Sequence, residues 1–254
     1  MSEARIVLEA KNLTKIYAKG ATEVVAVDGV SFSVRTGECL GIVGESGSGK
    51  STIANLLVRL ADPTSGSIIL NGKDITCAKD KELRAAQRRM QMVFQQPAGS
   101  FDPRRSLGDG IAESLRNDGI GRREARRQAE ELLELVELPA SFYDRFPQQA
   151  SGGQCQRAAI ARALATGPDL LVCDEATSAL DVTVQRQVVE LLSRLRAELG
   201  LAMIFICHDI ALADGACEEV LVMKSGVAVE QGPTSRVLHE PQDPYTHLLI
   251  DSVL

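Results

Sequence analysis

The sequence predicts an α/β fold with a parallel sheet core, an antiparallel β subdomain and an inserted α-helical subdomain. Apolar runs that end in glycine or polar residues recur along the chain, and most precede a helical pattern, which is typical of a parallel sheet covered on both faces. A mostly helical stretch from about Asp80 to Thr166 separates two groups of such runs. With 254 residues, of which 44% are hydrophobic, the chain is long enough to bury a sizeable core.

The N-terminal third carries the β layer and the first strand–loop–helix unit. Residues 5–10 and 23–34 have strand-like patterns. The apolar run 38–44 leads through a glycine-rich loop into a helical pattern from Ser51 to Leu60, and residues 66–72 form another strand between turn signals. We therefore expect an antiparallel layer beside a strand–loop–helix unit.

The helical middle of the chain is the expected insertion. Residues 121–138 alternate charges with leucines at helical spacing, and their charged side is most simply a solvated face rather than a binding surface. We predict a single domain over residues 1–254. Its core and β subdomain take residues 1–95 and 167–254, and its helical subdomain takes residues 96–166.

The final third returns to alternating strands and helices. Residues 169–175, 201–209 and 219–226 are expected strands, and a helix is expected from Val184 to Leu199. Ligands of parallel α/β sheets bind at the carboxyl ends of the strands. The residues expected to converge there are Gly44, Asp174, Glu175 and His208.

Composition narrows the classes of function and the cellular location. A net charge of −6 argues against a nucleic-acid binder that works through a basic face. No apolar run approaches the roughly 18 residues that span a bilayer, and the N-terminus lacks a signal-peptide core. A cytoplasmic chain is expected. Its cysteines form no C-x-x-C pair and are expected to be free thiols: Cys39, Cys77, Cys155, Cys173, Cys207 and Cys217.

A phosphate-binding loop is the strongest motif. The segment "GESGSGKS" at 44–51 fits G-x-x-x-x-G-K-[ST] and lies between an apolar strand and a helix, so a chance glycine turn is disfavoured. Such a loop wraps backbone N–H groups around phosphate oxygens, Lys50 reaches the terminal phosphates and the Ser51 hydroxyl ligates Mg²⁺. The motif predicts that the chain binds a nucleoside triphosphate. Its expected contacts are Gly44, Glu45, Ser46, Gly47, Ser48, Gly49, Lys50, Ser51 and Thr52.

Two carboxylates and a histidine follow later strands. In "LLVCDE", Asp174 is placed to join the Mg²⁺ shell and Glu175 to orient or deprotonate an attacking water. His208 follows "MIFIC" and is placed to contact the γ-phosphate. By themselves these residues often mark only strand ends or caps, but the phosphate loop favours the catalytic interpretation.

A second glycine loop, "ASGGQ" at 150–154, opens an alanine-rich helical pattern. Ser151, Gly152 and Gly153 can present a hydroxyl and N–H groups at the helix start. The loop resembles the signature of the ATP-binding cassette (ABC) family, usually L-S-G-G-Q. In that family it binds the γ-phosphate held by a second subunit, in a head-to-tail dimer around two ATPs, which implies that Gln154 also lies at the partner's nucleotide.

Further segments match the family in order, which implies a P-loop, RecA-like core. Tyr17 in "KIYAKG" matches the aromatic that stacks on adenine, and Gln95 in "MVFQQP" matches the Q-loop glutamine near the metal and the reaction. Asp181 in "SALD" matches the D-loop, and His208 matches the switch histidine. The plain alternatives are a strand-edge aromatic, a surface amide and a helix cap. The resemblance thus implies Mg²⁺ ligands at Ser51, Gln95 and Asp174.

Three positions depart from the family pattern. Ala150 replaces the usual signature leucine, Cys155 follows the signature, and Ala176 stands where many members have proline. Because the other motif residues persist, the resemblance implies a chain that forms both a catalytic site and the lid for its partner's site.

The branch of the family is suggested by three segments: 44–52, 93–115 and the tail "HEPQDPYTHLLIDSV" at 239–253. They resemble ATPase subunits of bacterial dipeptide, oligopeptide and nickel importers. The resemblance implies an identical or different second ATPase chain, two membrane permease subunits and, indirectly, an extracytoplasmic solute-binding protein, at the cytoplasmic face of the inner membrane. The surface from Gln95 to about Leu115 is expected to receive a permease helix, with Phe101 a candidate contact. The plain alternative is a proline-punctuated loop that enters a helix.

Three other classes of function stay open from the sequence. An accessory ATPase of a soluble complex, such as the carbon–phosphorus lyase machinery, shares a similar short tail. DNA-repair and translation cassettes usually carry insertions or tandem cassettes, and a simple P-loop kinase has no use for "ASGGQ" and "SALD".

Overall fold

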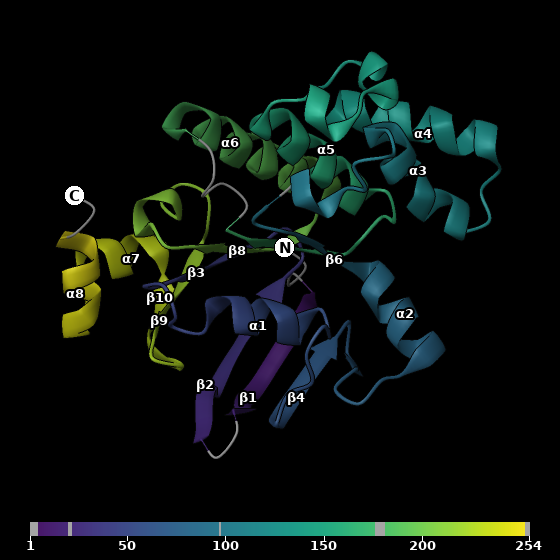
Figure 1. Ribbon diagram of the computed structural model, residues 1–254. Helices are drawn as coiled ribbons and strands as arrows, with labels where there is room; N and C mark the ends of the chain where they lie inside the picture. Colours follow the sequence, from purple (N-terminus) through teal and green to yellow (C-terminus); the bar gives the residue numbers. More distant parts are fainter. Residues whose placement is uncertain (1–4, 20–21, 97, 176–180, 252–254) are drawn as a thin grey trace.

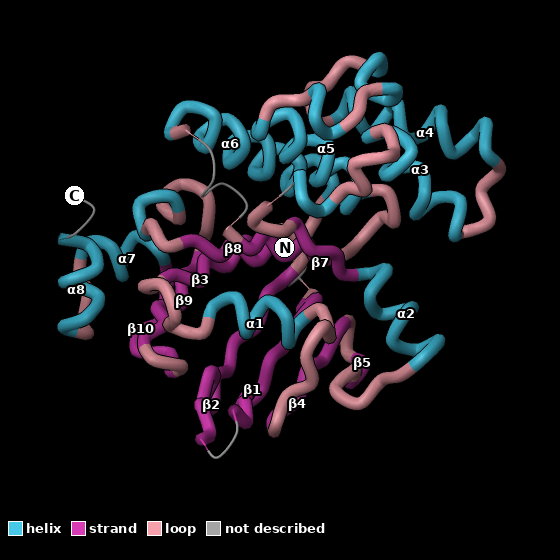
Figure 2. The backbone as a smooth tube through the Cα atoms, viewed as in Figure 1, coloured by secondary structure: helices cyan, strands magenta, loops and turns pink. Residues whose placement is uncertain are grey.

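The structure, a computed structural model, describes residues 5–19, 22–96, 98–175 and 181–251. Its strands form two sheets (Figures 1 and 2). The strands are β1 (Ile6–Lys19), β2 (Thr22–Arg35), β3 (Cys39–Val43), β4 (Ser65–Leu70), β5 (Lys73–Asp74), β6 (Met90–Val93), β7 (Leu170–Asp174), β8 (Ala202–Cys207), β9 (Glu219–Lys224) and β10 (Val227–Pro233). The order is β2-β1-β4-β5 in one sheet and β10-β9-β3-β8-β7-β6 in the other.

The helices form two groups around the larger sheet. They are α1 (Lys50–Leu57), α2 (Asp80–Arg89), α3 (Leu107–Asn117), α4 (Arg122–Leu135), α5 (Gly152–Leu164), α6 (Val182–Leu199), α7 (Thr234–His239) and α8 (Pro244–Asp251). Four short 3₁₀ turns are η1 (Ala98–Ser100), η2 (Ala140–Asp144), η3 (Pro147–Gln149) and η4 (Ile210–Leu212). Among the described residues, no helix is long and apolar enough to cross a membrane.

The larger sheet is the predicted parallel core. Neighbours β9, β3, β8, β7 and β6 all pair in parallel. All five residues of β3 and of β7 are buried, as expected for strands covered on both faces. Alternate side chains serve two cores: Leu40 and Ile42 pack with α1 and the β subdomain, whereas Cys39 and Val43 pack with the upper helices of Figure 1.

Four strands differ from the sequence-based expectation, and one of them is β5, an unexpected two-residue strand that pairs antiparallel with β4. β1 continues past residue 10 to Lys19, because it pairs antiparallel with β2 from Ile6 opposite Arg35 to Lys19 opposite Thr22. β6 lies within the stretch expected to be mostly helical, since it pairs with β7 as a four-residue edge strand. β10 was not expected and pairs antiparallel with β9.

The described cysteines are free thiols, as predicted. Five of them are buried, and the sulfurs of Cys39 and Cys217 lie 3.0 Å apart. The predicted subdomain boundaries at 95/96 and 166/167 remain a prediction. Within the upper helices, α3 packs on α4, α5 and η2.

Gly108→Ala is expected to destabilise the helical subdomain. A Cβ at Gly108 would lie 2.2 Å from the ring of Tyr143, so α3 could not keep its contact with η2. Overpacking of this kind costs about 1–3 kcal/mol, which should lower the Tm by several degrees. Gly99→Ala is the matched control, because its Cβ would meet nothing nearer than 3.9 Å. Thermal unfolding followed by circular dichroism checks both, and equal Tm values would contradict the packing argument.

Candidate functional site

The glycine loop joins β3 to α1 against the backbone of two other strands. A Cβ at Gly44 would lie 2.2 Å from the carbonyl oxygen of Met223, and one at Gly49 would lie 2.4 Å from that of Ala26. Both glycines also have positive φ angles, 147° and 106°. No larger residue fits at either position without moving the loop.

The start of α1 has the features of an anion site. Gly49 is its N-cap, no side chain caps the helix, and no acidic residue occupies its first turn. The first N–H groups of a helix lack intrahelical partners and carry positive potential. A phosphate group would provide the missing acceptors, so residues 44–52 fit the phosphates of a nucleotide.

Lys50 is buried at the centre of this loop. Its Nζ donates hydrogen bonds to the carbonyl oxygens of Gly44 (2.7 Å) and Glu45 (2.8 Å). Burial lowers the pKa of Lys50, and the nearby carboxylates of Glu175 and Asp174 oppose that effect. Its ammonium group is therefore held in the loop, next to the acidic end of β7.

Two of the three predicted metal ligands touch each other. The Ser51 hydroxyl donates to Oδ1 of Asp174 at 3.1 Å, joining the start of α1 to the end of β7. The third, Gln95, donates its Nε2 to Oε2 of Glu175 at 2.6 Å. A hydroxyl, a carboxylate and an amide oxygen are oxygen donors of the kind that Mg²⁺ prefers, so the set fits this ion.

The predicted catalytic residues lie at one edge of the sheet. β7 and β8 pair with Asp174 opposite Ile206, and the backbone N–H of Glu175 donates to the Ile206 carbonyl at 3.0 Å. His208 follows the end of β8 and is exposed. The structure thus places Glu175 and His208 at the same carboxyl edge as the glycine loop; their catalytic roles stay predictions.

Tyr17 lies on β1 near this loop. It pairs with Val24 of β2, two residues from Ala26, whose carbonyl oxygen faces Gly49. Tyr17 is 41% exposed, and the ammonium of Lys15 lies 4.9 Å from its ring centroid. An exposed aromatic face beside the phosphate loop fits a stacked base.

The second glycine loop forms the N-terminus of α5. Ser151 is the N-cap: its hydroxyl accepts from the backbone N–H of Gln154 (3.3 Å), whose side-chain oxygen accepts from the Ser151 N–H (2.9 Å). Ser151 and Gly152 are exposed. A Cβ at Gly153 would lie 2.6 Å from Cγ1 of Val184, so α5 and α6 meet closely there.

The predicted D-loop is described only at its last residue. Asp181 is the N-cap of α6, and its Oδ1 accepts from the Val184 N–H at 3.1 Å. Residues 178–180 lie outside the described part of the chain, as does Ala176. The helix-cap interpretation of Asp181 is therefore correct, and a role at the nucleotide stays a prediction.

A groove of about 830 Å³ lies beside Gln95, between the core and the helical subdomain. Phe94 lines it and is 40% exposed. The expectation that Phe101 is a surface contact is wrong: it is 5% exposed, and the guanidinium of Arg162 lies 4.4 Å from its ring centroid. Phe94, adjacent to Gln95, is the exposed aromatic that the sequence interpretation missed.

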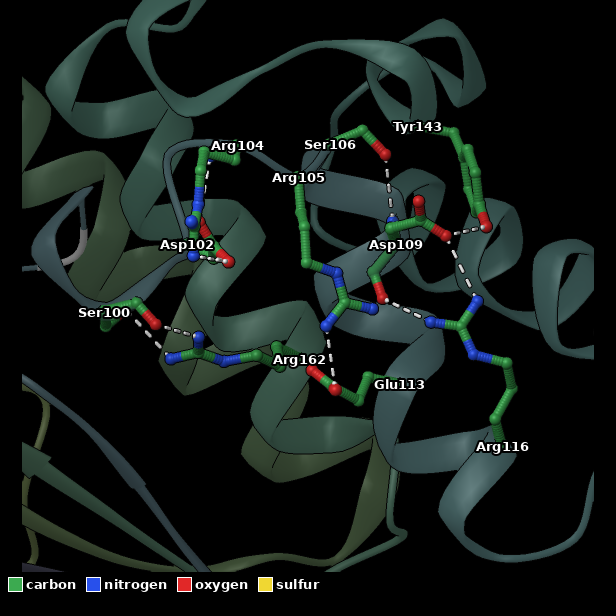
Figure 3. A network of polar contacts seen from close by, with 10 residues as sticks. All are labelled: Ser100, Asp102, Arg104, Arg105, Ser106, Asp109, Glu113, Arg116, Tyr143 and Arg162. Carbon is green, nitrogen blue, oxygen red and sulfur yellow. Dashed lines mark hydrogen bonds and ion pairs between the residues drawn. The ribbon is translucent and has the colours of Figure 1, made fainter.

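Polar contacts fix the segment that leads from the groove into the helical subdomain (Figure 3). Arg162 of α5 donates to the carbonyl (2.5 Å) and hydroxyl (2.9 Å) oxygens of Ser100. Farther along, Arg105 pairs with Glu113 at 2.8 Å. Arg162 therefore joins α5, which begins with the second glycine loop, to the wall of the groove.

Asp174→Asn is expected to stabilise the nucleotide-free fold while it weakens Mg²⁺-dependent activity. Burial raises the pKa of Asp174, and the hydrogen bond from Ser51 opposes this. A carboxyl whose pKa is higher in the folded chain costs stability once the pH exceeds its unfolded value of about 3.9. The neutral amide removes this cost, so the Tm should rise by about 2–4 °C at pH 7.5, with a gain that shrinks toward pH 4. Melting curves at both pH values check this, and an unchanged Tm at pH 7.5 would contradict it.

The family model described as "ABC transporter" matches residues 27–178. A putative peptide import ATP-binding protein of Brucella ovis is 42% identical over 247 residues, covering 97% of this chain and 78% of that protein. A probable peptide ABC transporter ATP-binding protein of Sinorhizobium fredii is 46% identical over 258 residues, covering 98% and 72%. Both descriptions name peptides, so nickel has no specific support.

Solved structures confirm the predicted fold class. The post-hydrolysis dimer of an ATP-binding cassette bound to ADP and phosphate has a TM-score of 0.82 and 32% identity, with coverage of 89% of this chain and 98% of that one. CbiO1 of Clostridium perfringens, part of the ABC transporter complex CbiONQ, has a TM-score of 0.84 and 28% identity, with coverage of 93% and 92%.

Proposed function

The chain belongs to the ABC transporter family as an ATP-hydrolysing cassette, and we propose that it powers a bacterial importer of peptides. The observation that carries this proposal is the joining of Lys50, Ser51, Asp174 and the Gln95–Glu175 pair at one sheet edge. The relatives described as peptide import proteins support the choice of substrate class.

Each residue of this edge takes one part in hydrolysis. Lys50 and the first N–H groups of α1 bind the phosphates, and Tyr17 stacks on the base. Ser51, Asp174 and Gln95 would hold Mg²⁺, which would supply positive charge that neutralises the phosphates.

Two further residues, Glu175 and His208, act on the attacking water and on the γ-phosphate, respectively. Glu175 orients the water and accepts its proton, and the contact from Gln95 to Glu175 holds that carboxylate in place. His208, at the end of β8, contacts the γ-phosphate.

We further propose that the cassette works as a head-to-tail dimer with an identical or different chain. Ser151, Gly152, Gly153 and Gln154 would close over the partner's nucleotide, as the exposure of Ser151 and Gly152 at the start of α5 allows. The similar cassette bound to ADP and phosphate is itself a dimer, which supports this arrangement. Asp181 would lie at the same interface.

The groove beside Gln95 is the proposed binding site for a helix of the permease subunit. Closure of the dimer would move α5 and, through Arg162 and Ser100, the wall of this groove. In this proposal two membrane subunits sit above the cassettes at the cytoplasmic face of the inner membrane. An extracytoplasmic protein delivers the substrate.

The test is affinity purification of the tagged chain from native membranes and cytosol, with mass spectrometry of the bound proteins. Two multi-span proteins, lost on Phe94→Asp but kept on Leu199→Asp, would support the importer. Leu199 is also exposed, at 47%, but ends α6 outside the residues that line the groove. Recovery only with soluble enzymes would contradict transport and favour the accessory ATPase of a soluble complex.

A further inference from the structure

The C-terminal tail contacts the phosphate loop through one hydroxyl group. We propose that Tyr245, on α8, is a positioning residue for that loop: it holds the backbone of Glu45, which in turn holds Lys50. The proposal rests on the proposed role of Lys50 in binding phosphate. It gives a function to the "PYT" segment, which nucleotide chemistry otherwise leaves unused.

Glu45 is held from both sides of its backbone. Its N–H donates to the Tyr245 hydroxyl at 3.0 Å, and its carbonyl accepts from Lys50 Nζ at 2.8 Å. Tyr245 is 5% exposed, so its hydroxyl is fixed by packing rather than free in solvent. Loss of the hydroxyl would leave the Glu45 N–H without this partner and free the peptide that fixes the ammonium group of Lys50.

Buried carboxylate contacts place Tyr245 at this point. Glu230 of β10 is 8% exposed, and its oxygens accept from the backbone N–H groups of Gln242 (3.0 Å) and Asp243 (3.1 Å). Asp243 in turn accepts from the N–H of Tyr245 at 2.8 Å. The start of α8 is therefore fastened to the edge of the central sheet before the tyrosine reaches the loop.

The surroundings of the tyrosine ring belong to the same site. The ammonium of Lys224, at the end of β9, lies 4.7 Å from the ring centroid, and the preceding residue, Met223, packs its carbonyl against Gly44. α8 also contacts η4, which begins two residues after His208. The tail thus touches the phosphate loop and the short turn that follows His208 (α8 is at the C-terminal end in Figure 1).

A purely structural role makes a different prediction. The hydroxyl of a buried tyrosine commonly has a hydrogen-bond partner. If that hydrogen bond is purely structural, its removal lowers the free energy of unfolding and leaves nucleotide binding unchanged. A positioning role predicts weaker nucleotide binding with an unchanged turnover number, because the hydroxyl acts through the loop that binds phosphate and not on the attacking water.

Tyr245→Phe separates the two roles. The variant keeps the ring and removes only the hydroxyl, so the KM for MgATP and the Kd for MgADP should rise about three- to tenfold, the factor expected for one lost hydrogen bond. The kcat should stay within about twofold. Calorimetric titration and phosphate-release kinetics give these values. Glu230→Gln, which weakens the anchor of the tail, should shift KM in the same direction by a smaller factor.

Tyr143→Phe is the matched control. Tyr143 is equally buried, at 6% exposed, but its hydroxyl donates to Asp109 in the helical subdomain at 3.4 Å. Its KM should equal that of the parent chain. An unchanged Kd in Tyr245→Phe, or an equal rise in Tyr143→Phe, would overturn the positioning role. If Lys50→Ala binds MgADP as the parent does, the proposed phosphate site itself fails.

Discussion

Glu175→Gln is expected to stop ATP turnover and to trap the chain as an ATP-bound dimer. Glutamine keeps the shape of the side chain and still offers an oxygen to Nε2 of Gln95, which lies 2.6 Å from the carboxylate. An amide cannot accept the proton of the attacking water, so kcat should fall by about 10²–10⁴-fold. Binding should persist, because Lys50, Ser51 and the α1 N-terminus are untouched.

The measurement pairs phosphate release with light scattering in MgATP. The variant should run as a dimer in MgATP and as a monomer without nucleotide, whereas the parent chain should return to monomer as ATP is consumed. Glu134→Gln is the control, because it makes the same chemical change at an exposed position of α4. Parental turnover in Glu175→Gln would show that another group accepts the proton.

Local sequence patterns predicted the parallel core except β6, because each of its other strands is encoded where it forms. The runs that became β3, β7 and β8 are apolar apart from Asp174 at the end of β7, and they are buried on both faces, so no distant partner was needed to recognise them. β6 has only four residues after a helix, and its strand conformation depends on pairing Met90 with Leu170, 80 positions away. Pairings of that kind leave no periodic signal in so short a segment.

The functional site likewise contains residues that local sequence motifs predict and residues that only long-range contacts bring into place. The phosphate loop is one contiguous motif. Its geometry depends on Gly44 and Gly49, where a side chain would collide with neighbouring backbone. Phe101 was expected at the surface, yet Arg162 from α5 covers its ring. Because the two residues are far apart in the sequence, no local pattern predicts this contact. Tyr245 and Glu45 lie 200 positions apart in the sequence. From the sequence, the tail indicated only which branch of the family the chain resembles, and its contact with the phosphate loop is visible only in the folded structure.

A mixture of two inactive variants is expected to recover ATPase activity if the site is shared between chains. Lys50→Ala removes the phosphate-binding ammonium, and Ser151→Arg places a bulky cation at the exposed start of α5. Ser151 is preferred to Gly153, where any side chain would also collide with Val184. Each variant alone should lose hydrolysis by more than about 100-fold, because both sites of its homodimer are defective.

In a mixed dimer, the defects fall on different halves of the molecule. One site combines the intact phosphate loop of the Ser151→Arg chain with the intact "ASGGQ" loop of the Lys50→Ala chain, whereas the other site carries both defects. Random pairing makes about half of the dimers mixed, so about a quarter of the sites are intact and activity should approach that fraction. Lys50→Ala mixed with Glu175→Gln is the control, since both defects then lie on the same side of every site and no intact site forms. A Lys50→Ala and Ser151→Arg mixture without hydrolysis would contradict a site shared between two chains, and full hydrolysis by Ser151→Arg alone would place the second glycine loop outside the nucleotide site.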